Sequence, residues 1–255
     1  MKALLIVASG KSSRFGGYPK AFCKIGDSTN VQNTINLTQN LYDKIYVALN
    51  HEIYDDYTDL IEGATVLRIT MGQGDAHSLL KCLRLIQNEN KNVEHLTVCW
   101  GDAFFLDRTP FDQLLDKSDI QRAPVWVAVS VDQRPYAWFE TTENMEIIRS
   151  HFAKKEGFME KGIHDQSLFL FDLSYGIFYL NEYRKLLRIP EENDDKFKEE
   201  NEMKLLYSFE YLNQANKENR ARCVMIDAGK VLSFNTIDEL EEIRTIWSAK
   251  SEGRN

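Results

Sequence analysis

The chain has 255 residues, a net charge of -8, and a hydrophobic content of 43%. This length suits one large α/β domain or two small ones, and the composition is ordinary for a packed core. The acidic balance argues against a broad nucleic-acid-binding surface, so an anionic ligand would need a local basic pocket. No apolar run is long enough for a signal peptide or a membrane span, and the four cysteines form no Cys-x-x-Cys pair. We therefore expect a cytoplasmic protein without a zinc site or a disulfide framework.

The first hundred residues alternate between apolar strand patterns and helical patterns. Helices are predicted over 30–41, capped by Ser28 or Thr29, and over 75–87, and a helical connection is expected over 53–61. The predicted strands are 2–7, 44–49, 64–69 and 95–100. This alternation predicts a mostly parallel sheet with helices on both faces.

The second half is less regular. A small antiparallel excursion is expected over 137–141 and 145–148, and a polar, acidic surface loop over 189–200. Strands are predicted over 125–131, 177–180 and 222–226, and helices over 202–216 and 237–248. Neither an internal repeat nor a linker with a clear break in composition is present.

A loop with glycine, serine and two cations follows the first strand. Its residues Ala8, Ser9, Gly10, Lys11 and Ser12 let backbone N–H groups approach a phosphate closely. Arg14 and Lys20 add two positive charges, which fit a nucleoside triphosphate. The P-loop pattern fails because Leu5 stands where a glycine is needed, and the dinucleotide fingerprint fails at Ser12 and Phe15.

Two further segments place polar groups where α/β proteins bind nucleotides. Gln73, Gly74 and Asp75 stand between a predicted strand and a predicted helix, where glycine lets the backbone pass close to a base and Gln73 offers an amide edge. Asp75 is equally well explained as the N-cap of the helix. Asp102 follows the strand over 95–100, and open α/β sheets bind ligands at the carboxyl ends of their strands. A carboxylate there suits Mg²⁺, which prefers oxygen ligands.

Five segments, in order along the chain, resemble the nucleotidyltransferase family. Residues 7–20 are similar to the opening pattern L-[AS]-[AG]-G-x-[GS]-[ST]-R-[MF]-(x)n-P-K, in the short-insert form of the molybdopterin-guanine and related transferases. Residues 71–78 resemble the base-binding segment, and 96–104 the [LV]-x-G-D segment. Residues 157–178 resemble the Glu-Lys-Pro and x-G-[IL]-[YF] segments of sugar-1-phosphate nucleotidyltransferases, with Gly162 in place of the proline. Residues 231–240 resemble the closing segment, in which Thr236 and Glu239 also form a capping-box pattern.

The resemblance implies a fold and a role for each matching residue. The fold is a single GT-A-like, Rossmann-like domain over 1–250, with a nucleotide-binding half to about 120, an acceptor-binding half beyond it, and a tail over 251–255. The implied catalytic residues are Arg14, Lys20 and Lys161. The nucleotide would be bound by Ala8, Ser9, Gly10, Lys11, Ser12, Gln73, Gly74 and Asp75. Mg²⁺ would be held by Asp102 and Asn235, with Asp227 as a weaker candidate. The acceptor would be bound by Tyr136, Trp138, Glu160, Lys161 and Gly176.

The implied reaction is magnesium-dependent transfer of a nucleoside monophosphate from a nucleoside triphosphate to a sugar 1-phosphate, with release of pyrophosphate. A cytidylyltransferase acting on a small phosphorylated alcohol or amino-acid derivative is an alternative, because the acceptor region departs from the sugar pattern. A regulatory protein that binds a nucleotide without catalysis is a second alternative. A glycosyltransferase is disfavoured, because Phe104 stands where a D-x-D motif needs its second Asp. Neither a nucleic acid nor a membrane is expected as a partner.

Overall fold

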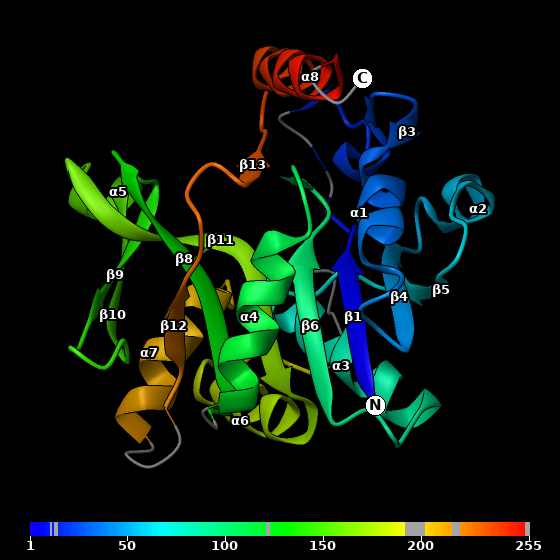
Figure 1. Ribbon diagram of the computed structural model, residues 1–255. Coiled ribbons are helices and arrows are strands. Elements are labelled where there is room, and N and C mark those ends of the chain that lie inside the picture. The colour runs from blue at the N-terminus through cyan, green and yellow to red at the C-terminus, as the bar shows by residue number, and fades with distance from the viewer. Residues whose placement is uncertain (11, 13–14, 121–122, 192–201, 216–219, 253–255) are drawn as a thin grey trace.

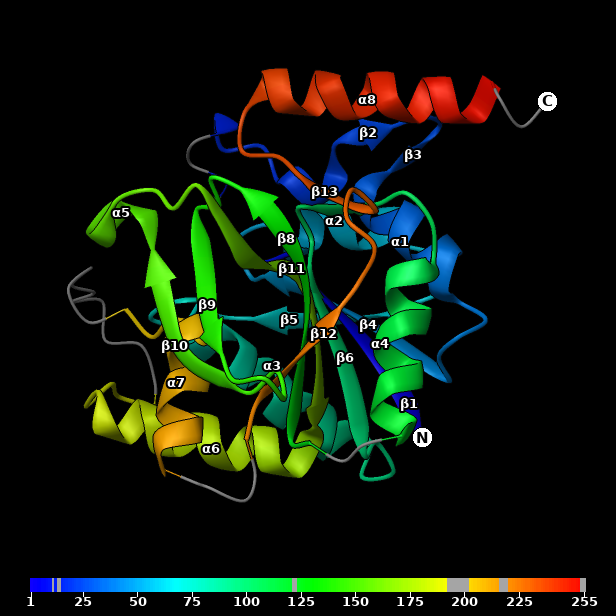
Figure 2. The ribbon, with the colours of Figure 1, turned by 60° about the vertical axis from the view of Figure 1, so that its left-hand side comes forward.

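The computed structural model describes residues 1–10, 12, 15–120, 123–191, 202–215 and 220–252. A central β-sheet lies between two layers of helices, and the C-terminal helix lies across one end of the sheet (Figures 1 and 2). This arrangement confirms the predicted α/β fold with helices on both faces of the sheet. Among the described residues, no helix combines the length and the hydropathy needed to cross a membrane.

The first half of the chain forms a parallel sheet, as predicted. The strand order is β5-β4-β1-β6, with β1 (Lys2–Val7), β4 (Lys44–Asn50), β5 (Thr65–Ile69) and β6 (His95–Trp100). The connections contain α1 (Asn30–Thr38), α2 (Tyr54–Tyr57), η3 (Thr58–Leu60) and α3 (Asp75–Glu89). The Thr29 side chain caps α1 by accepting the Gln32 N–H group, so the predicted start of that helix is confirmed.

The second half extends the sheet with a long antiparallel strand, β11 (Lys161–Asp172), which pairs with β6 on one side. On its other side β11 pairs with β8 (Val125–Gln133), and β8 pairs in parallel with β12 (Arg222–Met225). The expected antiparallel excursion is the pair β9 (Ala137–Thr141) and β10 (Ile147–Phe152). The helices of this half are α4 (Thr109–Ile120), α5 (Ala153–Glu156), α6 (Leu173–Leu186) and α7 (Leu205–Ala215).

Two small antiparallel ribbons lie outside the central sheet. The first pairs β2 (Lys24–Ile25) with β3 (Ser28–Thr29), close behind the short helix η2 (Lys20–Phe22). The second pairs β7 (Ala103–Phe105) with β13 (Val231–Ser233), and the last helix α8 (Ile237–Glu252) follows it. The aromatic rings of Phe104 and Trp247 meet edge to face at 5.4 Å, which joins this ribbon to α8.

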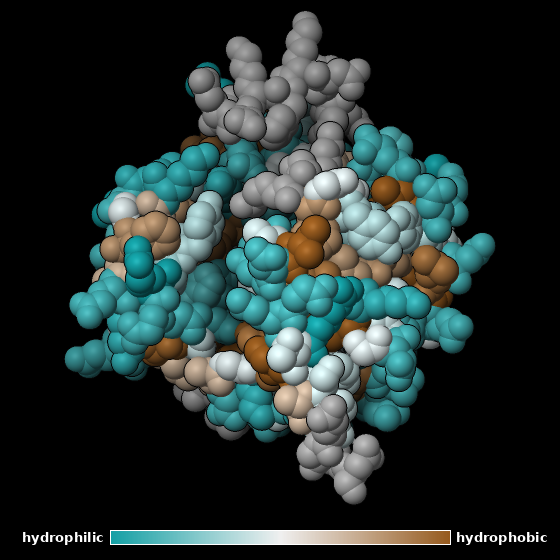
Figure 3. All heavy atoms as spheres, turned by 90° about the horizontal axis from the view of Figure 1, so that it is seen from above, coloured by the Kyte–Doolittle hydropathy of each residue, from teal (hydrophilic) through white to brown (hydrophobic). Residues whose placement is uncertain are grey.

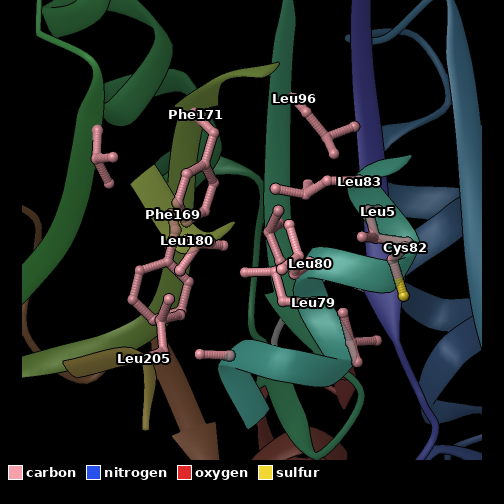
Figure 4. Close-up of a cluster of buried hydrophobic side chains, with 14 of the residues drawn as sticks. Leu5, Leu79, Leu80, Cys82, Leu83, Leu96, Phe169, Phe171, Leu180 and Leu205 are labelled. Carbon is pink, nitrogen blue, oxygen red and sulfur yellow. The ribbon is translucent and has the colours of Figure 1, made fainter. Parts of the chain in front are cut away.

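The alternating side chains of the strands divide the core into two layers. Leu4 and Ile6 of β1 face α1 and α4, whereas Leu5 faces α3 and α6. Figure 4 shows the second layer, in which Leu83 of α3 and Phe171 of β11 are among the packed residues. Because both faces of the sheet are covered, ligand binding is left to the ends of the strands.

The structure corrects several predictions from the sequence. The predicted strand over 177–180 is wrong, because these residues lie in helix α6, whose N-cap is Asp172. An apolar run this short fits either a strand or a buried helix, and the N-cap Asp172 is the feature of the sequence that favours the helix. The sequence also did not predict the elements η2, β2, β3, β7, α4, α5, β11 and β13. Helix α1 ends at Thr38 and α7 begins at Leu205, three residues inside the predicted limits. Most of the loop predicted over 189–200 lies outside the described residues, and Ile189 is buried.

We expect Leu83→Ala to lower the free energy of unfolding by about 2–5 kcal/mol, because Leu83 is fully buried between α3 and α6. Leu85→Ala in the same helix removes an exposed side chain and should change stability by less than about 0.5 kcal/mol. Urea unfolding followed by circular dichroism measures both values. Equal losses in the two variants would contradict the packing described here.

Candidate active site

The Lys20 side chain joins three distant segments at one point. Its Nζ atom donates to Asp102 Oδ2 at 2.7 Å, to the Phe234 carbonyl oxygen at 3.0 Å and to Asn235 Oδ1 at 3.1 Å. The Lys20 side chain is only 14% exposed, and that of Asp102 is 35% exposed. The structure therefore brings together the predicted catalytic lysine and both predicted metal ligands.

Asp102 is fixed from both sides along the chain. The Gly101 N–H group donates to the Val7 carbonyl, which ties the end of β6 to the end of β1. A Cβ atom at Gly101 would lie 3.1 Å from the Ala8 Cα atom, so a larger residue would require the end of β1 to shift by a few tenths of an ångström. The buried Asn30 amide donates to the Gly101 and Ala103 carbonyls at 2.9 and 3.0 Å. These contacts hold the peptide groups that flank the carboxylate.

Asn235 reaches the same point because β13 pairs with β7. Ser233 lies opposite Ala103, so the residues after β13 come next to the residue before β7. Phe234 is fully buried, which anchors the ribbon. The Glu239 carboxylate accepts the N–H groups of Asn235 and Thr236, and the Thr236 hydroxyl accepts the Glu239 N–H group. The predicted capping box is thus confirmed.

The loop after β1 borders open space next to this cluster. Ala8 and Ser9 are buried, whereas a Cβ atom at Gly10 would meet no described atom within 4 Å. The Ser12 carbonyl accepts the N–H groups of Phe15 and Gly17. Ser12 Oγ in turn accepts the Lys20 N–H group at 3.3 Å. The predicted roles of Lys11 and Arg14 fall outside the described residues.

The predicted base-binding segment is folded against residues 203–205. The Met203 N–H group donates to the Gln73 carbonyl, and the Ala76 N–H group donates to the Met203 carbonyl. The Asp75 side chain does not cap its own helix, since Gly74 stands at the N-cap position of α3. Instead, Asp75 Oδ1 accepts the N–H groups of Ala76 at 2.7 Å and of Leu205, the first residue of α7, at 2.8 Å.

Two titratable groups of this segment have shifted pKa values. Desolvation and, to a smaller extent, the nearby charges of Lys81 and Arg184 lower the pKa of His77 to about 4. His77 is buried, and its Nδ1 atom accepts the Gln73 N–H group at 3.1 Å, which requires the neutral ring. Desolvation raises the pKa of Asp75 to about 6, although its two N–H donors act in the opposite direction. The buried place of His77 supports a structural role.

A cavity of about 210 Å³ opens beside these elements. Trp100, the last residue of β6, and Asp75 line it on the side of the predicted nucleotide-binding half. The remaining residues that line it are Tyr136, Ala137, Phe152, His164, Asp165, Glu202, Lys204, Leu205 and Leu206. Sequence reasoning found only Asp75 and Tyr136 of this set. Trp100 could also have been predicted, because it stands two residues before Asp102 at the end of a parallel strand, where such sheets bind ligands.

The other predicted acceptor residues do not line the cavity. Trp138 is buried and stacks on the His151 ring at 5.2 Å. Glu160 and Lys161 are exposed, and Lys161 is the first residue of β11. Gly176 is buried in α6 and packs against Phe171, away from the other predicted residues. The acceptor roles of these four residues therefore stay predictions from the resemblance. Asp227 pairs with Gln113 of α4 and is not part of the Lys20 cluster.

Comparison with known proteins gives two findings. The sequence profile of the MobA-like NTP transferase domain matches residues 4–167, more than half of the chain. A solved structure from Bacillus anthracis, assigned as a glucose-1-phosphate thymidylyltransferase in complex with a sucrose, is similar with a TM-score of 0.71. The sequence identity is 13%, over 97% of this chain and 95% of that chain, so the likeness shows the fold alone. No curated protein matches the sequence.

We expect Asn30→Ala to destabilise the protein by about 1–3 kcal/mol, because the buried carbonyls of Gly101 and Ala103 would lose their donor. Asn36→Ala removes an exposed amide from the same helix and should have little effect. Urea unfolding again gives both values. A variant of Asn30 as stable as the parent would show that these hydrogen bonds do not hold the turn.

The low pKa of His77 should make the protein less stable in acid. Unfolding returns this pKa from about 4 to 6.5, so the unfolded chain takes up the proton first and stability falls as the pH drops below about 6.5. Between about pH 7.5 and about pH 5 the parent should lose about 2 kcal/mol more than His77→Asn, in which the amide oxygen replaces Nδ1 as acceptor.

Because the pKa of Asp75 is raised in the folded protein, its protonation below about pH 6 stabilises the folded state. This effect is the same in the parent and in His77→Asn. Urea unfolding across this pH range isolates the difference. His95→Asn, a change at an exposed histidine, is the control and should follow the parent. If the His77 variant also follows the parent, the assigned pKa shift is wrong.

Proposed function

Because the chain belongs to the family of MobA-like NTP transferases, we propose that it transfers a nucleoside monophosphate from a nucleoside triphosphate to a sugar 1-phosphate. Pyrophosphate leaves, and the reaction depends on Mg²⁺. The convergence of Lys20, Asp102 and Asn235 carries the proposal, because a cation and two oxygen ligands at one point suit a metal-bound triphosphate.

The residues of the cluster fit a magnesium ion. Asp102 Oδ2 and Asn235 Oδ1 lie within hydrogen-bonding distance of the same Nζ atom, so two hard oxygen ligands already converge. Among the described residues no group of three His, Cys, Asp or Glu side chains forms a metal site. A site with one carboxylate is compatible with Mg²⁺, because most ligands of this ion are usually phosphate oxygens and water molecules. When bound, the ion would neutralise the charge of the triphosphate.

The protein groups would act by position and charge. The N–H groups of the loop after β1 and Arg14 would bind the β- and γ-phosphates. Lys20 would leave its oxygen partners and neutralise the α-phosphate as negative charge builds there. An acceptor phosphate is already anionic near neutral pH, so its oxygen attacks the α-phosphorus in line without a general base. Lys161 is proposed to orient that acceptor phosphate.

The alternative acceptors remain part of the proposal. A cytidylyltransferase that acts on a small phosphorylated alcohol or amino-acid derivative is the alternative, because the acceptor segment departs from the sugar pattern at Gly162. A purely regulatory nucleotide-binding protein would need neither the paired metal ligands nor the catalytic lysine. A cytoplasmic location also stays a proposal.

We expect Lys20→Ala and Asp102→Ala each to reduce turnover about 10²-fold or more, because each removes charge that stabilises the transition state. Lys24→Ala, which removes an exposed lysine from the neighbouring strand β2, should keep full activity. The assay is magnesium-dependent pyrophosphate release with CTP, UTP, GTP and ATP against sugar 1-phosphates, phosphorylated alcohols and phosphorylated amino acids. Circular dichroism spectra of the variants test whether each one is folded.

Each result of the assay decides a different point. Release that needs one nucleotide and one acceptor fixes the reaction. An Asp102→Ala variant that turns over like the parent excludes the metal assignment. Nucleotide binding without release from any pair supports the regulatory alternative.

A further inference from the structure

The cavity beside Trp100 has the lining of a site for a cation. Three aromatic side chains line it, those of Trp100, Tyr136 and Phe152. Aromatic faces attract ammonium groups through their ring quadrupole, and a small cavity strengthens this attraction by removing water. The Phe152 ring already lies 5.2 Å from a cation, the Nζ atom of Lys204.

The charged groups of the cavity leave an excess of negative charge. Glu202 and Lys204 pair with each other at 3.4 Å, so their charges largely cancel. Asp75 and Asp165 remain, while His164 Nδ1 is engaged with the Ala137 carbonyl at 2.6 Å. These two carboxylates would repel an anionic group of a ligand and attract a cationic one.

The two carboxylates have few partners in the protein. Both N–H donors of Asp75 reach Oδ1, and none of the hydrogen bonds among the described residues reaches its Oδ2. Asp165 Oδ2 accepts the Ser167 N–H group at 3.3 Å, the carboxylate also accepts the N–H group of its own residue, and its Oδ1 lies 3.8 Å from His164 Nδ1. Desolvation raises the pKa of both carboxyl groups, although His164 acts in the opposite direction on Asp165 and Lys204 does so on Asp75. An ammonium group in the cavity would supply the missing charge.

The position of the cavity connects it to the acceptor. Trp100 is the last residue of β6 and stands two residues before Asp102, so the cavity and the proposed metal site lie at the same end of this strand. Further lining residues come from β9, β10 and β11 in the predicted acceptor-binding half. Figure 3 shows the face above this end of the sheet as mostly hydrophilic, without one broad hydrophobic area.

We infer that the acceptor is a small phosphorylated molecule that carries an ammonium group, which lies between the aromatic rings and the carboxylates of Asp75 and Asp165. This inference rests on the proposed function and narrows its acceptor. Both the sugar and the non-sugar alternatives contain such molecules, as amino-sugar 1-phosphates and as phosphorylated amino alcohols or amino acids. The phosphate end would extend toward Asp102, where nucleotidyl transfer takes place.

Binding of matched pairs of acceptors tests the inference. Calorimetric titration of the full-length protein compares glucosamine 1-phosphate with glucose 1-phosphate, and phosphoethanolamine with the monophosphate of ethylene glycol. We expect the amine of at least one pair to bind about tenfold more tightly than its neutral partner. Asp165→Asn keeps the acceptor for the Ser167 N–H group and should reduce this ratio to near one.

A control and a second variant secure the result. Glu143→Gln removes an exposed carboxylate from the turn between β9 and β10, outside the cavity, and should keep the parent's preference. Tyr136 is more than half exposed, so Tyr136→Leu should fold even if the Asp165 variant does not, and it should weaken binding of the amine alone. Equal affinities within both pairs, no binding of any acceptor, or a preference unchanged in these two variants would overturn the inference.

Pyrophosphate release separates this inference from the proposed function. Release with equal use of amine and neutral acceptors would retain the function and reject the ammonium site. A strong preference in binding, without release from any nucleotide, would retain the site and reject the function.

Discussion

The contact of the Lys20 ammonium with Asp102, Asn235 and the Phe234 carbonyl is the interaction on which the candidate active site depends. A lysine that is 14% exposed needs oxygen partners, because an unpaired charge with little access to water is costly. Asp102 lies 82 positions after Lys20 in the sequence, and Asn235 lies 215 positions after it. The site is therefore a product of tertiary structure: the loop after β1, the end of β6 and the β7–β13 ribbon have to meet before its charges balance.

The order of the strands explains why the three segments meet there. From β1 the chain moves to β4 and β5 on one side, and it then crosses to β6 on the other side of β1. The loops after β1 and β6 consequently leave the sheet in different directions, which opens a crevice at their carboxyl ends. Both faces of the sheet are already filled by the two hydrophobic layers. The cavity lined by Trp100 lies on the β6 side of this crevice, where β11 begins the antiparallel part of the sheet.

The sequence was informative where local patterns decide the structure. The apolar strands and amphipathic helices of the first hundred residues, the Thr29 cap and the Thr236–Glu239 capping box depend on neighbours in the chain, and the structure contains them. The sequence did not predict strand β11 because its first half, from Lys161 to Ser167, is mostly polar and is stabilised by pairing with β8 and, at Ile163, with β9. The roles of Asp75 and Asp165 also depend on distant segments. No spacing in the sequence indicates that Asp75 accepts the first N–H group of α7.

The late position of Asn235 in the chain has a consequence for biosynthesis. Ribosomes add about 5–20 residues per second, so Asn235 follows Lys20 after an interval on the order of ten to forty seconds. During this time the strands from β1 to β6 are available to pair, whereas Lys20 and Asp102 still lack their third partner. Packing of Phe234 and the edge-to-face contact of Phe104 with Trp247 of α8 then deliver that partner. A nascent chain thus lacks a complete cluster around Lys20 until the residues of β13 and α8 have been added.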